Sequence, residues 1–384
     1  MKTLRVLLCL CLCLPLVLLP CRAVAVEPLR EDDIRIAAPS AILMEKVTGR
    51  VLYEKNADER MLPASVTKVM TLLLIVEDLE AGRLSLDDIV TASPRAASFG
   101  GSCVYLEEGE QMTVHEMLKC ITVASANDCA VAMAEHLAGT EALFVERMNA
   151  RAEELGLKNT HFTNCTGLFE DAEHYSSARD IALMSRELIS HPLIKDYSTI
   201  WMDSIRDGSF GLTNTNKLVY WYEGCTGLKT GYTSGAMYCL AATAERDGTE
   251  YIAVIMHGES SDSRNADATA LLNYGFARYE LCPLQPETPL PELPVELGAE
   301  ETLSLRLEGE SAALIPKGSA GPEYLLDLPE RVTAPVEEGA RVGTLTVRLG
   351  GETLAELPVT AARTVEIIGI TPLFLRLLGS LLGL

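Results

Sequence analysis

Three short polar stretches carry the residues that could do chemistry: Ser65-Val-Thr-Lys68, Ser125-Ala-Asn127 and Lys229-Thr-Gly231. Ser65 and Lys68 open an apolar run, Val66–Leu79, which has the length of a helix and almost no polar side, so we expect it to be buried. Residues three apart share one face of a helix, and the serine hydroxyl and lysine amine would point into one cavity. Because apolar surroundings favour the neutral amine, the pair predicts a serine nucleophile with a lysine base.

The other two stretches supply groups that suit the same chemistry. Ser125 and Asn127 fall at a predicted break between two helices, where the serine could relay a proton and the asparagine could bind an amide. Lys229 and Thr230 offer a cation and a hydroxyl to a carboxylate, and Gly231 leaves room for a ligand beside the strand. Each stretch alone is also compatible with an ordinary helix cap or edge strand. Together, in this order, they are the signature of penicillin-binding proteins and class A β-lactamases.

The elements that must position these stretches follow from the hydrophobic pattern and the turn residues. A hairpin is predicted from the strands at 41–44 and 51–55, and it delivers the chain to Ser65. Helices are predicted at 66–79, from 114 to about 124, and at 128–138, 141–155, 178–190 and 266–279; strands are predicted at 219–222, 226–232, 237–245 and 251–256. Strands at both ends with helices between them predict an α+β fold with an antiparallel sheet flanked by helices. The three motifs make this fold resemble the β-lactamase/transpeptidase type.

Composition divides the chain into five parts: a signal peptide (1–25), a transpeptidase-like catalytic domain (35–280), a Pro-rich linker (281–294), a small β-rich domain (295–363) and an amphipathic helix (367–384). The first part has two basic residues before the apolar stretch Val6–Leu19 and an Ala23-Val-Ala25 cleavage site, so we expect the protein to be exported. The last part carries one charge, Arg376, and is short for a membrane span. It favours a helix that lies in the membrane interface.

Charge and cysteine content exclude several classes of function. The net charge of −22 argues against nucleic-acid binding. Four of the 11 cysteines lie in the first 25 residues, and the spacing of the others does not indicate a disulfide framework. His115-Glu116 begins a zinc-type H-E-x-x-H pattern, but Lys119 stands at its last position. The sequence therefore predicts neither a metal ligand set nor a cofactor.

A resemblance to a known family extends beyond the three motifs. The chain resembles the low-molecular-mass penicillin-binding proteins, which are the serine-type D-Ala-D-Ala carboxypeptidases of the S11 peptidase family. The resemblance covers about 35–280, and the parts that follow resemble that family's stalk and anchor. Cys165 is a departure, because proline is expected there. Four stretches carry the resemblance: Pro63-Ala-Ser-Val-Thr-Lys-Val-Met-Thr71, Ser125-Ala-Asn-Asp-Cys-Ala-Val-Ala-Met-Ala-Glu-His-Leu-Ala-Gly139, Leu155-Gly-Leu-Lys-Asn-Thr-His-Phe162 and Gly227-Leu-Lys-Thr-Gly-Tyr-Thr233.

The resemblance implies a role for each motif residue. Lys68 would take the proton of Ser65, which attacks the carbonyl between two D-alanines, and Ser125 would pass a proton to the leaving amine. Backbone N–H groups of Ser65 and Tyr232 would form the oxyanion hole. The catalytic set is then Ser65, Lys68 and Ser125, and the substrate-binding set is Asn127, Lys229, Thr230, Gly231 and Tyr232.

The resemblance also implies partners and a location. The substrates would be peptidoglycan stem peptides, and β-lactams would acylate Ser65 as inhibitors. The final helix would hold the enzyme on the outer face of the cytoplasmic membrane.

Three alternatives stay open at the level of the sequence. A D,D-endopeptidase that cleaves peptidoglycan cross-links shares all three motifs. A binding protein for β-lactams or wall peptides could keep the fold without turnover. A class A β-lactamase needs a deacylating glutamate in an E-x-x-L-N type loop, and Glu146-Arg-Met-Asn149 matches that pattern poorly.

Overall fold

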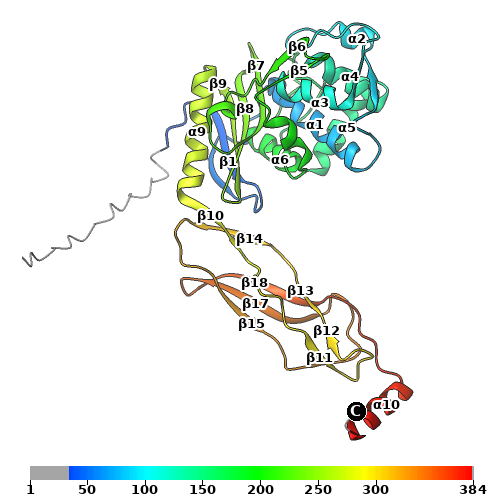
Figure 1. Cartoon of the computed structure of the whole chain (residues 1–384). Helices are drawn as coiled ribbons and strands as arrows, with labels where there is room; N and C mark the ends of the chain where they lie inside the picture. The colour runs from blue at the N-terminus through cyan, green and yellow to red at the C-terminus, as the bar shows by residue number, and fades with distance from the viewer. Residues whose placement is uncertain (1–33, 383–384) are drawn as a thin grey trace, which may run out of the picture.

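The computed structural model describes residues 34–382, so the predicted signal peptide lies outside the described residues. Figure 1 shows a catalytic part, in which helices surround an antiparallel sheet, followed by an elongated β-rich part and a C-terminal helix at its far end. The predicted α+β fold class is confirmed by this arrangement.

The central sheet has five antiparallel strands in the order β2-β1-β9-β8-β7. Their bounds are β1 (Ser40–Glu45), β2 (Val51–Lys55), β7 (Cys225–Thr233), β8 (Met237–Arg246) and β9 (Thr249–Gly258). The sheet separates two cores, because successive side chains of a strand point to opposite faces. On β1, Ile42 and Met44 join the core beneath the helices, whereas Ala41 and Leu43 join the core beneath α9 (Ser261–Arg278). The strand β7 ends the sheet and brings Lys229 to its edge.

The helices on one face of the sheet carry the other two motifs. They are the 3₁₀ helix η2 (Ala64–Thr67), α1 (Lys68–Glu80), α2 (Pro94–Ala97), α3 (Val114–Val123), α4 (Asn127–Ala138), α5 (Glu141–Glu154), α6 (Ala178–Leu188) and α7 (Leu193–Ser198). The residues of α1 from Lys68 to Val76 are all buried, as its apolar sequence predicts. The predicted capping box at the start of α3 is present: Thr113 accepts from the backbone N–H of Glu116, whose carboxylate accepts from that of Thr113. Two short two-stranded antiparallel sheets flank these helices: β3 (Ile89–Thr91) with β4 (Gln111–Thr113), and β5 (Met202–Ile205) with β6 (Phe210–Thr213).

One predicted strand is wrong. Residues 219–222, Val-Tyr-Trp-Tyr, are of types that favour a strand, but the chain forms the short helix α8 (Leu218–Trp221) there. Asn216 explains the difference, because its side-chain oxygen accepts from the backbone N–H of Leu218 at 3.2 Å. A side chain that bonds the backbone two residues later closes a turn, and the next residues continue it.

The β-rich part contains small sheets rather than one large one. A four-stranded sheet has the order β13-β18-β17-β15, β12-β11-β16 form a second sheet, and β10 pairs with β14. The bounds are β10 (Tyr279–Pro283), β11 (Leu293–Glu296), β12 (Thr302–Leu303), β13 (Leu305–Leu307), β14 (Ala312–Pro316), β15 (Glu323–Asp327), β16 (Val332–Thr333), β17 (Arg341–Leu349) and β18 (Glu352–Ala361). Strands therefore occupy both ends of the segment 281–294 that the sequence indicates as a linker.

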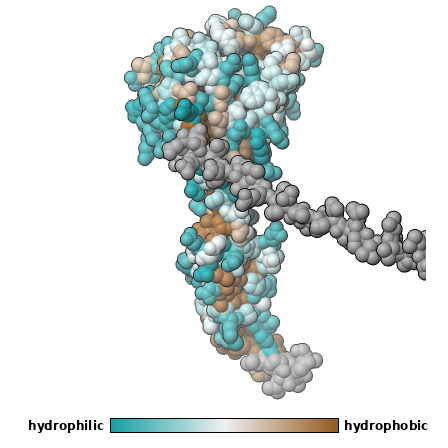
Figure 2. Space-filling model, turned by 90° about the vertical axis from the view of Figure 1, so that its left-hand side faces the viewer, coloured by the Kyte–Doolittle hydropathy of each residue, from teal (hydrophilic) through white to brown (hydrophobic). Residues whose placement is uncertain are grey.

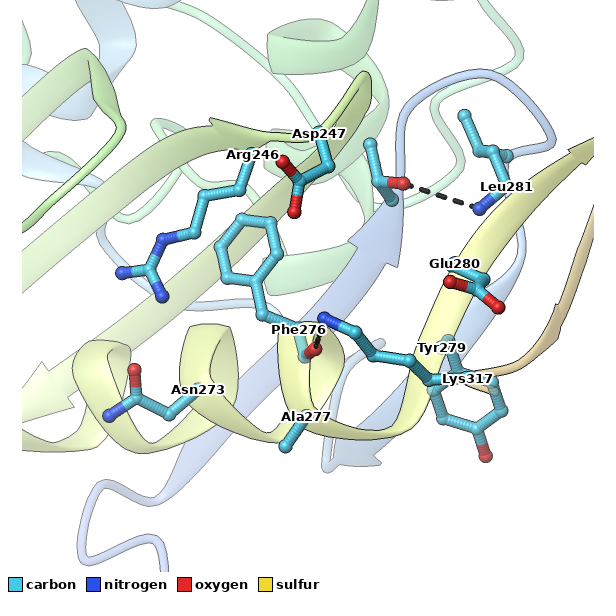
Figure 3. Close-up of a pocket in the computed structure, with 10 residues that line it drawn as sticks. Arg246, Asp247, Asn273, Phe276, Ala277, Tyr279, Glu280, Leu281 and Lys317 are labelled. Carbon is cyan, nitrogen blue, oxygen red and sulfur yellow. Dashed lines mark hydrogen bonds between the residues drawn. The ribbon is translucent and has the colours of Figure 1, made fainter. Parts of the chain in front are cut away.

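The junction between the two parts encloses a cavity of about 560 Å³ (Figure 3). Lys317 reaches back across it and donates to the carbonyl of Phe276 at 3.1 Å, and the N–H of Leu281 donates to Thr249 Oγ1 at 3.2 Å. Positive and negative side chains alternate along its lining, with Arg246 and Lys317 beside Asp247 and Glu280. These contacts join the end of α9 to the first strands of the β-rich part.

The chain ends in α10 (Ile370–Leu382). Apolar residues on it are exposed, with Ile370, Phe374 and Leu375 at 88%, 64% and 60%. Figure 2 shows hydrophobic residues in patches on the β-rich part and near its far end, whereas hydrophilic residues cover most of the catalytic face in view. Among the described residues, no helix has the length and apolar character needed to cross a membrane.

Candidate active site

The structure brings the three motifs together around Ser65. Ser65 lies in η2, one turn before α1, and Lys68 Nζ lies 3.0 Å from its Oγ. The amine also contacts Asn127 Oδ1 at 2.5 Å and the carbonyl oxygen of Thr166 at 3.0 Å. The i, i+3 spacing thus produces the contact that the sequence predicts.

The contacts of Lys68 fix the direction in which its lone pair can point. A neutral amine has two N–H donors and one lone pair. An amide oxygen and a carbonyl oxygen can only accept, so Asn127 and Thr166 take the two N–H groups. Ser65 Oγ is the one of the three partners that can donate, and the lone pair therefore faces the serine proton. This is the arrangement that a general base needs.

Burial makes the neutral amine available near neutral pH. The Lys68 side chain is fully buried. Burial lowers its pKa to about 7, against the weaker opposing effects of Cys165, Cys103 and Asp128. A lysine with this pKa can accept a proton at physiological pH without leaving the site permanently charged.

The loop between α3 and α4 holds Asn127 against Lys68. Ser125 adopts a positive φ of 62°, which turns the chain sharply between the two helices. The backbone N–H of Asn127 donates to the carbonyl of Ser102 at 2.7 Å, and its side-chain amide donates to that of Gly100 at 2.8 Å. These two hydrogen bonds fix the backbone and the side-chain amide of Asn127, and Oδ1 is directed at Lys68.

The strand β7 supplies the third motif. Lys229 Nζ donates to Ser125 Oγ at 2.8 Å and to the carbonyl of Thr230 at 3.0 Å. Its side chain is 1% exposed, and burial, followed by the positive charges of Lys68 and Arg264, holds its pKa well below the ordinary value. Thr230 Oγ1 donates to Thr215 Oγ1 at 2.7 Å. An incoming carboxylate would offset the positive charge at this point.

Two glycines make room for the backbone that carries the nucleophile. A Cβ on Gly231 would lie 2.8 Å from the carbonyl oxygen of Pro63 and 3.1 Å from the nitrogen of Ser65. A Cβ on Gly167 would lie 1.8 Å from the carbonyl oxygen of Ala64. The sequence suggested that Gly231 leaves room for a ligand. In the structure, its missing side chain also leaves room for the backbone of η2. Between these glycines Ala64 adopts a positive φ of 47°, a strained conformation beside the nucleophile.

The loop from 163 to 174 explains how the chain tolerates Cys165. Proline would have no backbone N–H at this position, whereas the N–H of Cys165 donates to Glu141 Oε1 at 3.2 Å. The carbonyl of Cys165 accepts from Thr71 Oγ1 on α1 at 2.7 Å, which keeps the following carbonyl of Thr166 beside Lys68. The cysteine side chain is fully buried, and the seven described cysteines are all free thiols.

His174 fastens the other end of this loop. The N–H of Thr163 donates to its Nδ1 at 3.0 Å, so Nε2 carries the proton and donates to Thr67 Oγ1 at 2.8 Å. Burial lowers the pKa of His174 to about 4, which keeps the ring neutral at pH 7. The loop is thus tied to η2 directly beside the nucleophile.

Tyr232 is the predicted site residue whose side chain lies furthest out. It is 56% exposed, and its ring packs on Tyr238 with centroids 4.5 Å apart. Its expected role needs only its backbone, which follows Gly231 along the edge of β7. Sequence reasoning gave no role to Thr166, His174 or Thr215, because each acts through a contact made across the fold and belongs to no short motif.

Comparisons with known proteins agree with this geometry. The family model for D-alanyl-D-alanine carboxypeptidase, peptidase S11, matches residues 25–260. The chain belongs to the S11 family of D-alanyl-D-alanine carboxypeptidases. A second model, for the C-terminal domain of penicillin-binding protein 5, matches residues 285–367.

Individual relatives cover between 63% and 91% of the chain. A D-alanyl-D-alanine carboxypeptidase of Bacillus subtilis, DacF, is 42% identical over 356 residues, which is 91% of each chain. Penicillin-binding protein 5 from Haemophilus influenzae has a TM-score of 0.75 at 30% identity and covers 87% of this chain and 98% of its own. Penicillin-binding protein D2 from Listeria monocytogenes, solved in its ampicillin-bound form, has a TM-score of 0.58 at 31% identity over 63% of this chain and 99% of its own. The predicted carboxypeptidase class is confirmed, and the alternatives are not favoured.

The pKa of Lys68 predicts how β-lactam acylation depends on pH. A protonated Lys68 cannot accept a proton, so the acylation rate should rise with pH through about 7 and then level off. One pH unit below this pKa roughly a tenth of the lysine is neutral, and acylation should be about tenfold slower than on the plateau. Stopped-flow measurement with a chromogenic cephalosporin would give the profile. In Lys68→Arg the guanidinium stays protonated, so the plateau rate of acylation should fall by about 10²-fold or more. A flat profile would contradict the assignment.

The contact between Gly167 and Ala64 predicts an effect of a single methyl group. Gly167→Ala should both destabilise the fold and slow β-lactam acylation, because the new Cβ displaces the carbonyl before Ser65. Gly156→Ala is a matched control, since Gly156 has the same positive φ of 70° but no atom within 4 Å of the added Cβ. The control substitution should lower the free energy of unfolding by about 1–2 kcal/mol and leave the acylation rate unchanged. Thermal unfolding would measure the loss of stability in each variant, and acylation kinetics would measure the effect on Ser65. Equal acylation rates for both variants would refute the role of this contact.

Proposed function

We propose that the protein removes the terminal D-alanine from peptidoglycan stem pentapeptides through an acyl-enzyme on Ser65. The observation that carries the proposal is the arrangement around Lys68, whose lone pair is left for Ser65 because its other two partners can only accept. A buried base held in this way activates a serine without a histidine.

The terminal carboxylate of the peptide would bind at Lys229 and Thr230. This places the scissile carbonyl at Ser65, where the backbone N–H groups of Ser65 and Tyr232 would stabilise the oxyanion. The closeness of Gly231 to the nitrogen of Ser65 supports this pairing, because it brings β7 against η2.

Proton transfer to the leaving D-alanine would use Ser125. Its hydroxyl accepts from Lys229 at 2.8 Å, so it can donate its own proton toward the leaving amine and recover one from the lysine. Water would then attack the acyl-enzyme with Lys68 again as the base. A β-lactam follows the same first step and leaves a slowly hydrolysed acyl group on Ser65.

Product analysis tests this activity. The protein lacking residues 1–25 is incubated with a muropeptide ending in D-Ala-D-Ala and, separately, with a cross-linked muropeptide dimer. Mass spectrometry should show loss of one alanine from the monomer, and Ser65→Ala should show none. Ser102→Ala, an exposed serine of the neighbouring loop, serves as the control for a serine-to-alanine change. Cleavage of the dimer alone would replace the proposal with an endopeptidase.

We propose further that the protein is exported and that α10 rests on the outer face of the cytoplasmic membrane. The exposed apolar residues of α10 support this location, because such a surface is stabilised by the acyl region of a bilayer. The β-rich part would then stand between the membrane and the catalytic part (Figure 1).

Vesicle co-sedimentation tests the membrane location. The protein should pellet with phosphatidylcholine vesicles, and the double variant Phe374→Asp, Leu375→Asp should stay in the supernatant. The double variant Leu325→Asp, Leu326→Asp is a matched control on β15, where both leucines are also exposed. An equal loss in both variants, or no pelleting of the parent protein, would count against the proposal.

A further inference from the structure

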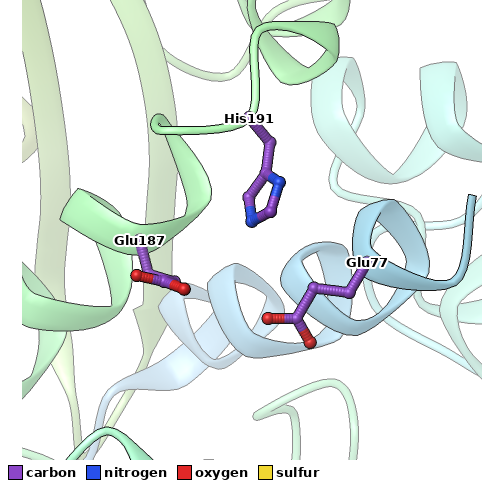
Figure 4. Close-up of side chains that lie close together, drawn as sticks. All are labelled: Glu77, Glu187 and His191. Carbon is purple, nitrogen blue, oxygen red and sulfur yellow. The ribbon is translucent and has the colours of Figure 1, made fainter. Parts of the chain in front are cut away.

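A second cluster of chemically active side chains lies away from Ser65. Glu77 on α1, Glu187 on α6 and His191, just after α6, converge at the surface of the catalytic part (Figure 4). One candidate ligand atom from each lies within 4.8 Å of the others, and all three residues are half-buried. Glu77 is nine residues after Lys68, about 14 Å along α1, so the cluster does not contact the proposed reaction.

One ring nitrogen of His191 makes a hydrogen bond, and the other has no hydrogen-bond partner among the described residues. Nδ1 lies 2.7 Å from Glu80 Oε2, and a carboxylate can only accept, so Nδ1 carries the proton. Nε2 then presents a lone pair. In the structure this atom is buried and has no hydrogen-bond partner. A buried acceptor without a partner costs free energy, which a ligand for that lone pair would recover.

The hydrogen bond between His191 Nδ1 and the Glu80 carboxylate is typical of a metal-binding histidine. Histidines that bind metal ions usually donate their other ring N–H to a carboxylate or carbonyl, which fixes the tautomer and raises the basicity of the ligating nitrogen. Glu80 does this for His191. The ring edge carrying Nε2 is directed toward Glu187 and Glu77 in Figure 4.

Arg151 on α5 is the cation already in contact with these glutamates. It donates to Oε1 of Glu77 at 2.9 Å and to Oε1 of Glu187 at 2.7 Å. In both carboxylates, the oxygen that Arg151 contacts is Oε1. The other oxygen of each carboxylate makes no described contact with Arg151 and remains for a second cation. Glu80, on His191, and Glu154, on Arg151, add two further negative charges nearby.

We propose that Glu77, Glu187 and His191 bind a divalent transition-metal ion of the zinc type. One imidazole nitrogen with two carboxylate oxygens suits Zn²⁺, whereas Ca²⁺ and Mg²⁺ prefer oxygen ligands throughout. A tetrahedral ion with bonds of about 2.0–2.1 Å needs ligand atoms about 3.3 Å apart. The candidate ligand atoms lie within 4.8 Å of one another in the structure, and metal binding would draw them closer together. The ion would join the end of α1 to the end of α6 and stabilise the helices that carry Ser65 and Lys68.

The binding experiment uses the protein without a polyhistidine tag and lacking residues 1–25. Calorimetric titration with ZnCl₂ should show one saturable site, and Co²⁺ should produce the visible ligand-field bands of a tetrahedral N/O site without thiolate charge-transfer bands. The melting temperature should rise with zinc concentration. Absence of binding to the parent protein would overturn the proposal.

Variants then locate the ion. His191→Ala and the nearly isosteric Glu187→Gln should each abolish the cobalt bands, and the unloaded melting temperature shows whether each variant is folded. Glu80→Gln should weaken binding by roughly 10- to 100-fold, because it holds the ligating ring. His136→Ala, on an exposed histidine of α4, should bind like the parent. Unchanged binding in His191→Ala would refute the site.

Arg151→Gln separates the metal from the guanidinium. Removal of the neighbouring positive charge should tighten zinc binding severalfold. Binding that occurs only in Arg151→Gln would show that the guanidinium is the resident cation and would overturn the proposal. The rate of β-lactam acylation should stay within about twofold of the parent in His191→Ala, because the cluster does not touch the reacting groups.

Discussion

The structure of the catalytic part depends on the complete burial of the Lys68 amine, which costs free energy because no carboxylate of the described residues contacts it. Moving a charged ammonium into such a place costs several kcal/mol, and the group responds by becoming neutral near pH 7. Three separate segments are needed to hold it: the 3₁₀ turn with Ser65, the start of α4 with Asn127 and the loop with Thr166. The fold can be understood as the means of bringing these segments to one nitrogen atom. Burial also lowers the pKa of the second buried lysine, Lys229, and a positive charge on Lys68 would lower it further.

The sequence was informative where local spacing determines geometry. Ser65 and Lys68 meet because they are one helical turn apart, and the capping box at Thr113 starts α3 where the pattern predicts. The strand predicted at 41–44 lies within β1, although its uniformly apolar residues do not indicate that they divide between two cores. These features need no knowledge of the rest of the chain.

Other features could not be read from short stretches. The helix α8 forms in place of a predicted strand because a single hydrogen bond accepted by the Asn216 side chain outweighs the strand preference of four residues. Thr166 contributes a carbonyl, and carbonyls carry no residue-specific signal. Gly167 is required by its closeness to Ala64, a residue that is about a hundred positions away in the chain. Glu77 and His191 are similarly distant in sequence, so no motif spacing could join them.

The position of β7 at the end of its sheet has a consequence for selectivity. An unpaired strand edge exposes backbone donors and acceptors, and proteins usually protect such edges against association with other chains. An extended peptide that completes this edge is read chiefly through its main chain, with each side chain pointing alternately away from the sheet. An enzyme built on such an edge tolerates variation along the body of the peptide and concentrates its discrimination at the terminus. Main-chain recognition along β7 would therefore place few demands on the side chains in the body of a bound peptide.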